Sequence, residues 1–325
     1  MNRNFARAVL LMGAPLYFAA CTVDGFEQNS SSLTAEESLI ASQTVGESVS
    51  ENQSGLLSSF SEAFAIPAAS GLLTGPSALA TGSFRNLDNY SYAYNSEIGV
   101  HTVSFSKQET SALQTTSTNY ILDYKFFDSS GNIIANPDNQ RQQIVALEFS
   151  ATRNGEITAS NKQSNFTRTD RLYIDGVTTT SEFLSIDEFH SGEGLFSQLK
   201  SDGTQIEREY FLDINYLNIR INNLLVQNNR NFRSGVSGAF SYEQTIRQRE
   251  SSSAQLETKI VNGTVELNGD GTALLKFREQ PERFRMKLAD GEIFDEDEFE
   301  GRVTRVNLQD QIFTLSNGQR IQINN

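Results

Sequence analysis

The chain holds few of the side chains that most often carry catalysis or bind a metal. Its only histidines are His101, in an expected strand, and His190, in a glycine-rich stretch. Zinc sites need several His or Cys ligands at short spacings, and the sequence has neither a His-Glu-x-x-His motif nor a pair of cysteines. A catalytic serine needs a histidine and an acid that converge in space, and His190-Ser191-Gly192 lacks the Gly-x-Ser-x-Gly pattern. The sequence therefore predicts no catalytic residue and no cofactor.

Clustered carboxylates are the feature closest to a metal site. Asp295 and Asp297 are the candidate ligands, within the run Asp295-Glu296-Asp297-Glu298, because Ca²⁺ takes roughly six to eight oxygen ligands. The spacing differs from that of an EF-hand, and alternation along a strand would divide these side chains between two faces. A solvated acidic loop is the simpler interpretation, so no metal is predicted. Since the chain has 40 acids, a hydrolase that uses two carboxylates stays open as a third functional hypothesis.

The single cysteine, Cys21, ends an apolar segment at the start of the chain. Arg3 and Arg7 precede an apolar run over residues 8–20. This run has the length of a signal-peptide core and is too short to span a bilayer, which requires about 20 apolar residues. The small residues Ala19 and Ala20, directly before Cys21, fit the narrow cleft of a signal peptidase.

Phe18-Ala19-Ala20-Cys21 resembles a lipobox, the cleavage and acylation motif of bacterial lipoproteins. The resemblance implies that residues 1–20 are a signal peptide and that Cys21 becomes a lipid-modified N-terminus that attaches the protein to a membrane. Lipoboxes usually have Leu where this chain has Phe18. An ordinary secretory signal with a free Cys21 thiol is the alternative, although a lone thiol is unusual in an exported protein. Thr22, in place of the Asp of the inner-membrane retention signal, favours the outer membrane.

The charge of the chain limits its partners. Loss of residues 1–20 would remove Arg3 and Arg7 and change the formal charge from −14 to −16. A field of this sign repels nucleic acid, so a nucleic-acid partner is not expected. Because no second cysteine is available for a disulfide, the hydrophobic core alone must stabilise the fold.

Residues 21–82 are expected to form a disordered or partly helical polar tether. The first part is rich in Ser, Glu, Gln and Asn, a composition that buries too little apolar surface to offset chain entropy. Thr34 and Glu37 have the spacing of a helix capping box. A second short helix is indicated by apolar residues at helical spacing, namely Leu56, Leu57, Phe60 and Phe64.

Residues 83–290 have the alternating pattern of half-buried antiparallel strands. Tyr120, Leu122, Tyr124 and Phe126 share one face, for example, while Asp123 and Lys125 share the other. The predicted fold class is all-β: an antiparallel meander that forms a barrel or half-barrel, with a two-sheet sandwich as the competing architecture. The expected turns are Ser130-Gly131-Asn132, Asp175-Gly176, Asp202-Gly203, Asn262-Gly263, Asp270-Gly271 and Asn317-Gly318.

Two segments of this region are ambiguous, and the C-terminal segment differs from it. Ser185–Phe189 fits one helical turn, and residues 216–226 fit a helix or a strand. Residues 291–325 are predicted to form a small separate β unit. Three of their segments are similar to small OB-like β modules of unknown function in bacterial envelope proteins, and this resemblance implies no activity: residues 301–306, 313–318 and 321–323.

The first functional hypothesis is a non-enzymatic, lipid-anchored envelope protein whose β domain binds an apolar ligand or a protein partner in its concavity. This hypothesis rests on the architecture alone, in which such a half-barrel would resemble lipoprotein carriers or lipocalin-like folds. A surface-exposed structural or adhesive lipoprotein, acting through strand edges and loops, is the alternative. The row Tyr90, Tyr92 and Tyr94 fits a sugar-binding platform or, more simply, a cross-strand ladder. The expected membrane contact is the lipid on Cys21.

Overall fold

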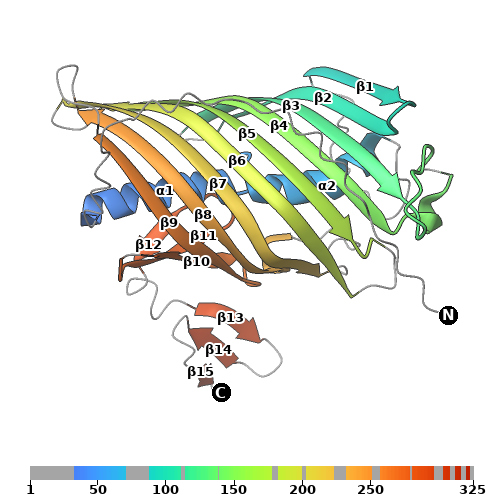
Figure 1. The fold of residues 1–325 in the computed structure, drawn as a ribbon. Coiled ribbons are helices and arrows are strands. Elements are labelled where there is room, and N and C mark those ends of the chain that lie inside the picture. The colour runs from blue at the N-terminus through green and yellow to red at the C-terminus, as the bar shows by residue number, and fades with distance from the viewer. Residues whose placement is uncertain are drawn as a thin grey trace, which may run out of the picture. The chain divides into compact units, whose positions relative to one another are not determined.

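In the computed structural model, a large antiparallel sheet contains twelve strands, each paired with the next along the chain (Figure 1). This arrangement confirms the predicted meander. The edges of the sheet are its first and last strands, so it is an open half-barrel, which curves around two helices. The structure describes residues 33–70, 88–110, 114–137, 139–177, 182–199, 203–222, 232–250, 257–278, 280–295, 303–307, 312–315 and 320–322.

The central strands are long, and their pairing register is continuous over most of their length. Neighbouring strands run antiparallel throughout, as tight hairpin connections require. In order, the strands are β1 (Asp88–Asn95), β2 (Val100–Thr110), β3 (Gln114–Phe127), β4 (Ala146–Ala159), β5 (Lys162–Asp175), β6 (Phe183–Leu199), β7 (Gln205–Asn222), β8 (Val236–Glu250), β9 (Glu257–Asn268), β10 (Thr272–Phe277), β11 (Arg283–Lys287) and β12 (Ile293–Asp295).

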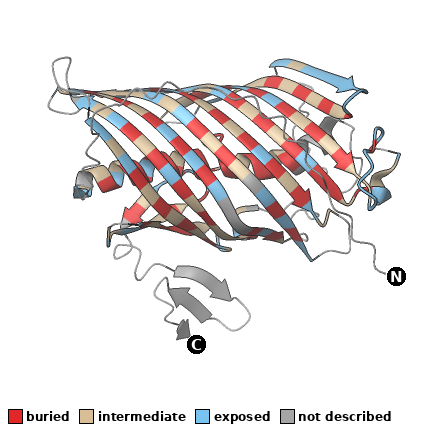
Figure 2. Ribbon diagram, viewed as in Figure 1, coloured by how far each residue is buried: buried red, intermediate tan, exposed pale blue. Residues whose placement is uncertain are grey.

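The concave face of the sheet carries the core. In β3, Tyr120, Leu122, Tyr124 and Phe126 are buried, as their spacing predicts, and the residues between them are more exposed. Figure 2 shows the same alternation of buried and exposed residues along the neighbouring strands. The period of two therefore identifies the inner face of the half-barrel correctly.

Two helices lie along the concave face: α1 (Ala35–Val49) and α2 (Leu56–Ser70). The predicted capping box is confirmed at the start of α1. The backbone N–H of Glu37 donates to Thr34 Oγ1 at 3.2 Å, and the backbone N–H of Thr34 donates to Glu37 Oε2 at 2.7 Å. Short 3-10 helices occur at η2 (Arg141–Gln143) and η3 (Phe232–Ser234).

The packing of these helices differs from the tether expected over residues 21–82. Leu56, Leu57 and Phe60 are at most 1% exposed and belong to the same hydrophobic core as the strands. Residues 33–325 form one compact unit by their contacts. The polar composition of the segment misled the prediction, because Ser59 donates a hydrogen bond to Asp170 of the sheet while Val45, Leu56, Leu57 and Phe60 are buried in the core.

Glycines on the concave face make room for aromatic rings of the neighbouring strand. Gly155 in β4 lies directly opposite Phe166 in β5. A Cβ atom at Gly155 would lie 2.3 Å from the ring of Phe166, so only glycine fits there without a shift. The same arrangement pairs Gly194 with Tyr210 and Gly263 with Tyr242.

This use of glycine explains one wrong turn prediction. Asn262 and Gly263 do not form a turn; they lie within β9, where Gly263 accommodates the ring of Tyr242. Two other predicted turns are confirmed, and the glycine of each has a positive φ: 78° at Gly131 and 89° at Gly271. Gly176, directly after β5, also has a positive φ of 82°, and residues 178–181 of the connection that follows lie outside the described residues. Asp202 and Asn317-Gly318 lie outside the described residues.

Irregular pairing explains the ambiguous segments. Ser185–Phe189 is not a helical turn; it lies in β6, with a register shift between Ile186 and Phe189. Residues 216–222 continue β7, with a shift between Leu217 and Arg220. Such a bulge changes the phase of the alternation, which gives a strand an apparent helical spacing.

A second, three-stranded antiparallel sheet follows near the C-terminus, as the sequence predicted. The preceding strand β12 pairs with β11, so the large sheet extends to Asp295, slightly beyond the expected boundary at residue 290. The small sheet contains β13 (Val303–Asn307), β14 (Ile312–Leu315) and β15 (Arg320–Gln322).

Candidate functional site

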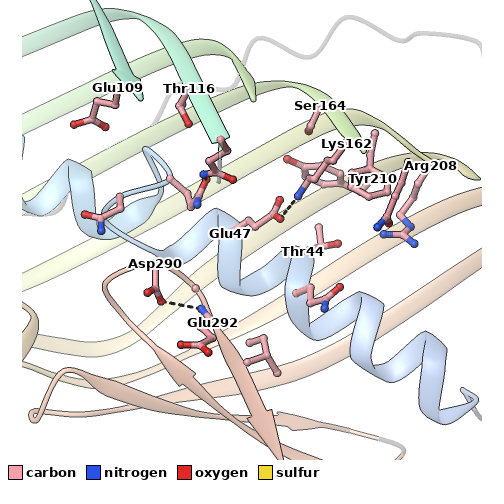
Figure 3. A pocket seen from close by; sticks show the side chains of 18 of the residues that line it. Thr44, Glu47, Glu109, Thr116, Lys162, Ser164, Arg208, Tyr210, Asp290 and Glu292 are labelled. Atoms are coloured by element: carbon pink, nitrogen blue, oxygen red, sulfur yellow. Dashed lines mark hydrogen bonds and ion pairs between the residues drawn. The ribbon is translucent and has the colours of Figure 1, made fainter. Parts of the chain in front are cut away.

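A cavity of about 970 Å³ opens at one end of the concave face (Figure 3). Its wall combines α1, the α1–α2 connection, the concave faces of β2, β3, β5, β6 and β7, and the turn between β11 and β12. The volume lies in the upper part of the range for ligand sites, which is roughly 300–1,000 Å³. The cavity is therefore the candidate functional site.

Close backbone packing positions α1 against the β11–β12 turn. A Cβ atom at Gly46 would lie 2.5 Å from the carbonyl oxygen of Gly291, so two glycines are needed for this approach. Just after the helix, the backbone N–H of Glu51 donates to Leu288 O at 3.1 Å, and that of Asn52 donates to Ala289 O at 2.8 Å. These contacts hold Asp290, Gly291 and Glu292 at the cavity wall.

Strand register brings a cation–aromatic cluster to the opposite wall. Phe196 in β6 lies directly opposite Ser164 in β5 and Arg208 in β7. The guanidinium carbon of Arg208 lies 4.9 Å from the centre of the Phe196 ring, and Lys162 Nζ lies 5.0 Å from it. Two cations thus contact one ring, an arrangement that stabilises each by about 0.5–2 kcal/mol depending on solvation.

Arg208 and Tyr210 are large, buried polar groups of this wall. Arg208 is 7% exposed, and its Nε and Nη2 donate to Gln248 Oε1 at 3.0 and 2.9 Å. Tyr210 is 4% exposed, and burial raises the pKa of its hydroxyl. The hydroxyl is therefore neutral at physiological pH and is able both to donate and to accept a hydrogen bond.

The acidic residues of the cavity are matched by nearby bases. Glu47 in α1 forms an ion pair with Lys162, which Figure 3 shows across the cavity. At the rim, Glu109 pairs with Lys107 at 2.6 Å, and Glu292 pairs with Lys287. The fourth acid, Asp290, accepts a hydrogen bond from the backbone N–H of Glu292 at 3.0 Å. The uncharged polar residues of the lining are Gln43, Thr44, Asn52, Gln53, Thr110, Gln114, Thr116, Ser164 and Gln198.

A second polar cluster lies between the sheet and α2. Asp170 in β5 is completely buried and forms an ion pair with Arg153 in β4. It also accepts hydrogen bonds from Ser59 Oγ at 2.5 Å and from His190 Nδ1 at 2.6 Å. Arg153 reaches α2 through Ser59 Oγ at 2.6 Å and through the carboxylate of Glu62 at 2.5 Å.

The ionisation of this cluster follows from its neighbours. Burial alone would raise the pKa of Asp170, but His190 and Arg153 outweigh it and lower the pKa to about 2. The carboxylate is ionised and accepts hydrogen bonds only, so His190 Nδ1 is the donor. Asp170, Arg153 and His190 are each 0% exposed, so the cluster docks α2 onto the sheet and offers no surface to a substrate.

Both histidines therefore have structural partners. His190 lies within β6 and not in a glycine-rich loop. His101 in β2 is buried, which lowers its pKa, and its Nδ1 lies 2.9 Å from the hydroxyl of Tyr92. Its ring stacks on Tyr94 at 4.5 Å between centroids. The tyrosines of β1 thus form the cross-strand contacts that were the simpler prediction for that row.

The predicted lipid-attachment residue and the two candidate metal ligands lie apart from the cavity or outside the described residues. Cys21 and Asp297 are outside them. Asp295 ends β12. Within the part of the chain that the structure describes, no group of three or more His, Cys, Asp or Glu is placed to hold a metal ion. In the same part, no helix is both long and apolar enough to cross a membrane.

The sequence itself indicates buried charged residues in β5, although no prediction was made from them. Arg168 and Asp170 alternate with Leu172 and Ile174 in β5, so they belong to the core-facing set. Charged residues in such positions are rarely buried unless they are paired. Their partners near the helices could not be identified from sequence, because Ser59, which donates to Asp170, and Gln53, whose backbone carbonyl accepts from Arg168, lie 111 and 115 positions away.

Comparison with known proteins gives no relative. The chain matches no protein-family model, no curated protein and no solved structure. Function is therefore argued from the geometry of the site alone.

Proposed function

We propose that this chain is a lipid-anchored protein of the bacterial outer membrane whose β domain binds a hydrophilic ligand and catalyses no reaction. The cavity of about 970 Å³ carries this proposal. An apolar ligand or a protein partner was the expectation from the sequence. The lining favours a hydrophilic one, because amide, hydroxyl and charged side chains surround Phe196, Tyr210 and Ile293. A buried polar wall that faced an apolar ligand would lose its hydrogen bonds to water without replacement.

The anchor rests on the lipobox-like residues that end at Cys21. If Cys21 carries the lipid, only residues 22–32 separate it from the first described residue, Leu33. Eleven residues reach at most about 40 Å when fully extended. The folded domain would then begin close to the membrane, and the tether would be much shorter than the one expected from the sequence.

The anchor is tested by Cys21→Ser in cells that are grown with a radiolabelled fatty acid. We expect the wild-type chain to incorporate label and to sediment with membranes. The variant should do neither and should stay folded. A Cys21→Ser protein that resists extraction from membranes with carbonate would contradict the anchor.

The binding function is tested by native mass spectrometry of the chain purified from envelopes. We expect a co-purified small molecule with the wild-type chain and its loss in Gln43→Trp, which places an indole at the cavity wall. Leu39→Trp is the matched control, because Leu39 lies one turn earlier on α1, is 41% exposed and does not line the cavity. Equal ligand loss in both variants, or no ligand in any sample, would count against the proposal.

A further inference from the structure

The charges of the cavity are balanced, which restricts the class of ligand. Four acids line it: Glu47, Glu109, Asp290 and Glu292. Lys162 and Arg208 line it as well. Lys162 pairs with Glu47, and Lys107 and Lys287, which lie outside the lining, pair with Glu109 and Glu292, so a base neutralises three of the four acids. A charged group of a ligand that approached one member of an ion pair would also lie close to the other member, which has the same charge as the ligand group. The wall therefore favours a neutral ligand.

The uncharged lining favours a ligand rich in hydroxyl groups. Gln43 and Gln198 each carry a carbonyl acceptor beside an amide donor, and threonine and serine hydroxyls both donate and accept. Gln114 Nε2 donates to Gln53 Oε1 at 3.2 Å within the same wall. A sugar hydroxyl likewise donates one hydrogen bond and accepts others. Such side chains are therefore able to form hydrogen bonds with neighbouring hydroxyl groups of a sugar and to leave neither donors nor acceptors unpaired.

The aromatic residues supply the apolar contact that a sugar ring needs. A pyranose has polar edges and a face of C–H groups, which packs on an aromatic ring. Phe196 and Tyr210 both lie in the cavity wall, where Lys162 Nζ and the guanidinium carbon of Arg208 lie 5.0 and 4.9 Å from the centre of the Phe196 ring. The wall thus places an apolar ring directly beside two hydrogen-bond donors, and a sugar that contacts the ring meets both.

A peptide fits this wall less well. Peptides commonly bind to sheet proteins by adding a strand to an exposed edge, through backbone hydrogen bonds. Of the strands that line this cavity, β2, β3, β5, β6 and β7 each have paired neighbours on both sides, and the edge strand β12 contributes only its first residue, Ile293. The cavity is therefore built from side chains on strand faces.

We infer that the cavity binds a neutral oligosaccharide, with one sugar ring packed on Phe196. The inference rests on the proposed binding function and specifies its ligand class. The volume of about 970 Å³ allows more than one sugar ring, so an oligosaccharide should bind more tightly than its monosaccharide.

The test is calorimetric titration of the purified chain with defined probes. The neutral probes are maltotriose, cellotriose and tri-N-acetylchitotriose, the acidic probe is 3′-sialyllactose, and the peptide probe is a Gly-Ser hexapeptide. We expect at least one neutral trisaccharide to bind. Phe196→Ala should weaken its binding about tenfold or more, which corresponds to about 1.4 kcal/mol.

Phe211→Ala is the matched control. Phe211 lies on the convex face of β7, is 37% exposed and packs under Arg247 at 5.6 Å, much as Phe196 packs under Arg208. This variant should bind the sugar as the wild type does. Equal weakening by both variants would place the sugar elsewhere and overturn the inference.

The remaining outcomes separate the ligand class from the binding function. Binding of the acidic sugar or the peptide alone would overturn the neutral sugar and leave the proposed function standing. Failure of every probe would also overturn the inference. The proposed function would then depend on its own test, the ligand that co-purifies from envelopes.

Discussion

Arg153 and Asp170 form an ion pair between neighbouring strands of the half-barrel, and neither side chain is exposed to solvent. Arg153 extends the pair to Glu62 on α2. The helix is thus held by charge and hydrogen bonds as well as by apolar contacts. Removal of one partner would leave a buried, uncompensated charge, which is far more costly than the loss of a surface ion pair.

The first prediction concerns this pair. Asp170→Asn should lower the free energy of unfolding by about 3 kcal/mol, the low end for a broken buried ion pair, because Arg153 would keep only Glu62 as a counter-ion. Asp213→Asn is the matched control, since Asp213 is exposed on the convex face of β7 and should change stability by less than about 0.5 kcal/mol. Urea denaturation followed by circular dichroism measures both. Equal stability of the two variants would show that the ion pair does not hold the structure.

The second prediction concerns the stability of the protein at acidic pH. The pKa of Asp170 falls from its ordinary value of 3.8 in the unfolded chain to about 2 in the folded protein. A lowered folded pKa stabilises the protein above the unfolded value, and that contribution is lost as the pH falls from about 4 towards 2. The loss should amount to about 2 kcal/mol. Asp170→Asn should show a shallower pH dependence over this interval, and an unchanged profile would contradict the assignment.

The third prediction concerns the contact between α1 and the β11–β12 turn. In an exposed helix, Gly→Ala stabilises by about 1 kcal/mol because alanine has the higher helix propensity. Gly46→Ala should instead destabilise, since its Cβ would lie 2.5 Å from the carbonyl oxygen of Gly291. A cost of about 1–3 kcal/mol is expected, together with weaker ligand binding, because Gly291 lines the cavity.

Gly192→Ala in β6 is the control for this prediction. The nearest atom to a Cβ at Gly192 is 3.5 Å away, an ordinary van der Waals distance. Its thermal midpoint should stay close to that of the wild type. A Gly46→Ala protein that melts above the wild type would mean that the helix is free to move away from the turn.

The β architecture was predictable because its cause is local. Alternation along β3 identifies Tyr124 and the other residues on the same face of the strand as core residues. The spacing of Thr34 and Glu37 identifies the start of α1. Each pattern depends on residues a few positions apart. Glycine was a less reliable indicator of a turn, because two different structural requirements lead to a glycine. A positive φ requires it at Gly131, whereas the ring of Tyr242 requires it at Gly263.

The site could not be predicted because strand register assembles it. Lys162, Phe196 and Arg208 belong to three strands, and only their pairing places both cations beside one ring. The position of the helices has the same kind of cause. Ser59 bonds to a strand residue 111 positions away, and no local pattern encodes that distance.

The last prediction tests whether the helices are part of the folded domain. The boundary expected from the sequence would place a complete β domain after residue 82. In the structure, Val45, Leu56, Leu57 and Phe60 fill the concave face, so a chain that begins at residue 83 would expose that face to water. Such a chain should aggregate or lack a cooperative unfolding transition.

A chain that begins at residue 22 should fold, and in it Phe60→Ala should lower the free energy of unfolding by about 3–5 kcal/mol. Leu39→Ala should have little effect, because Leu39 is 41% exposed on α1. Cooperative unfolding of the shorter chain, at the same midpoint as the longer one, would show that the helices are dispensable and that the half-barrel is stable without them.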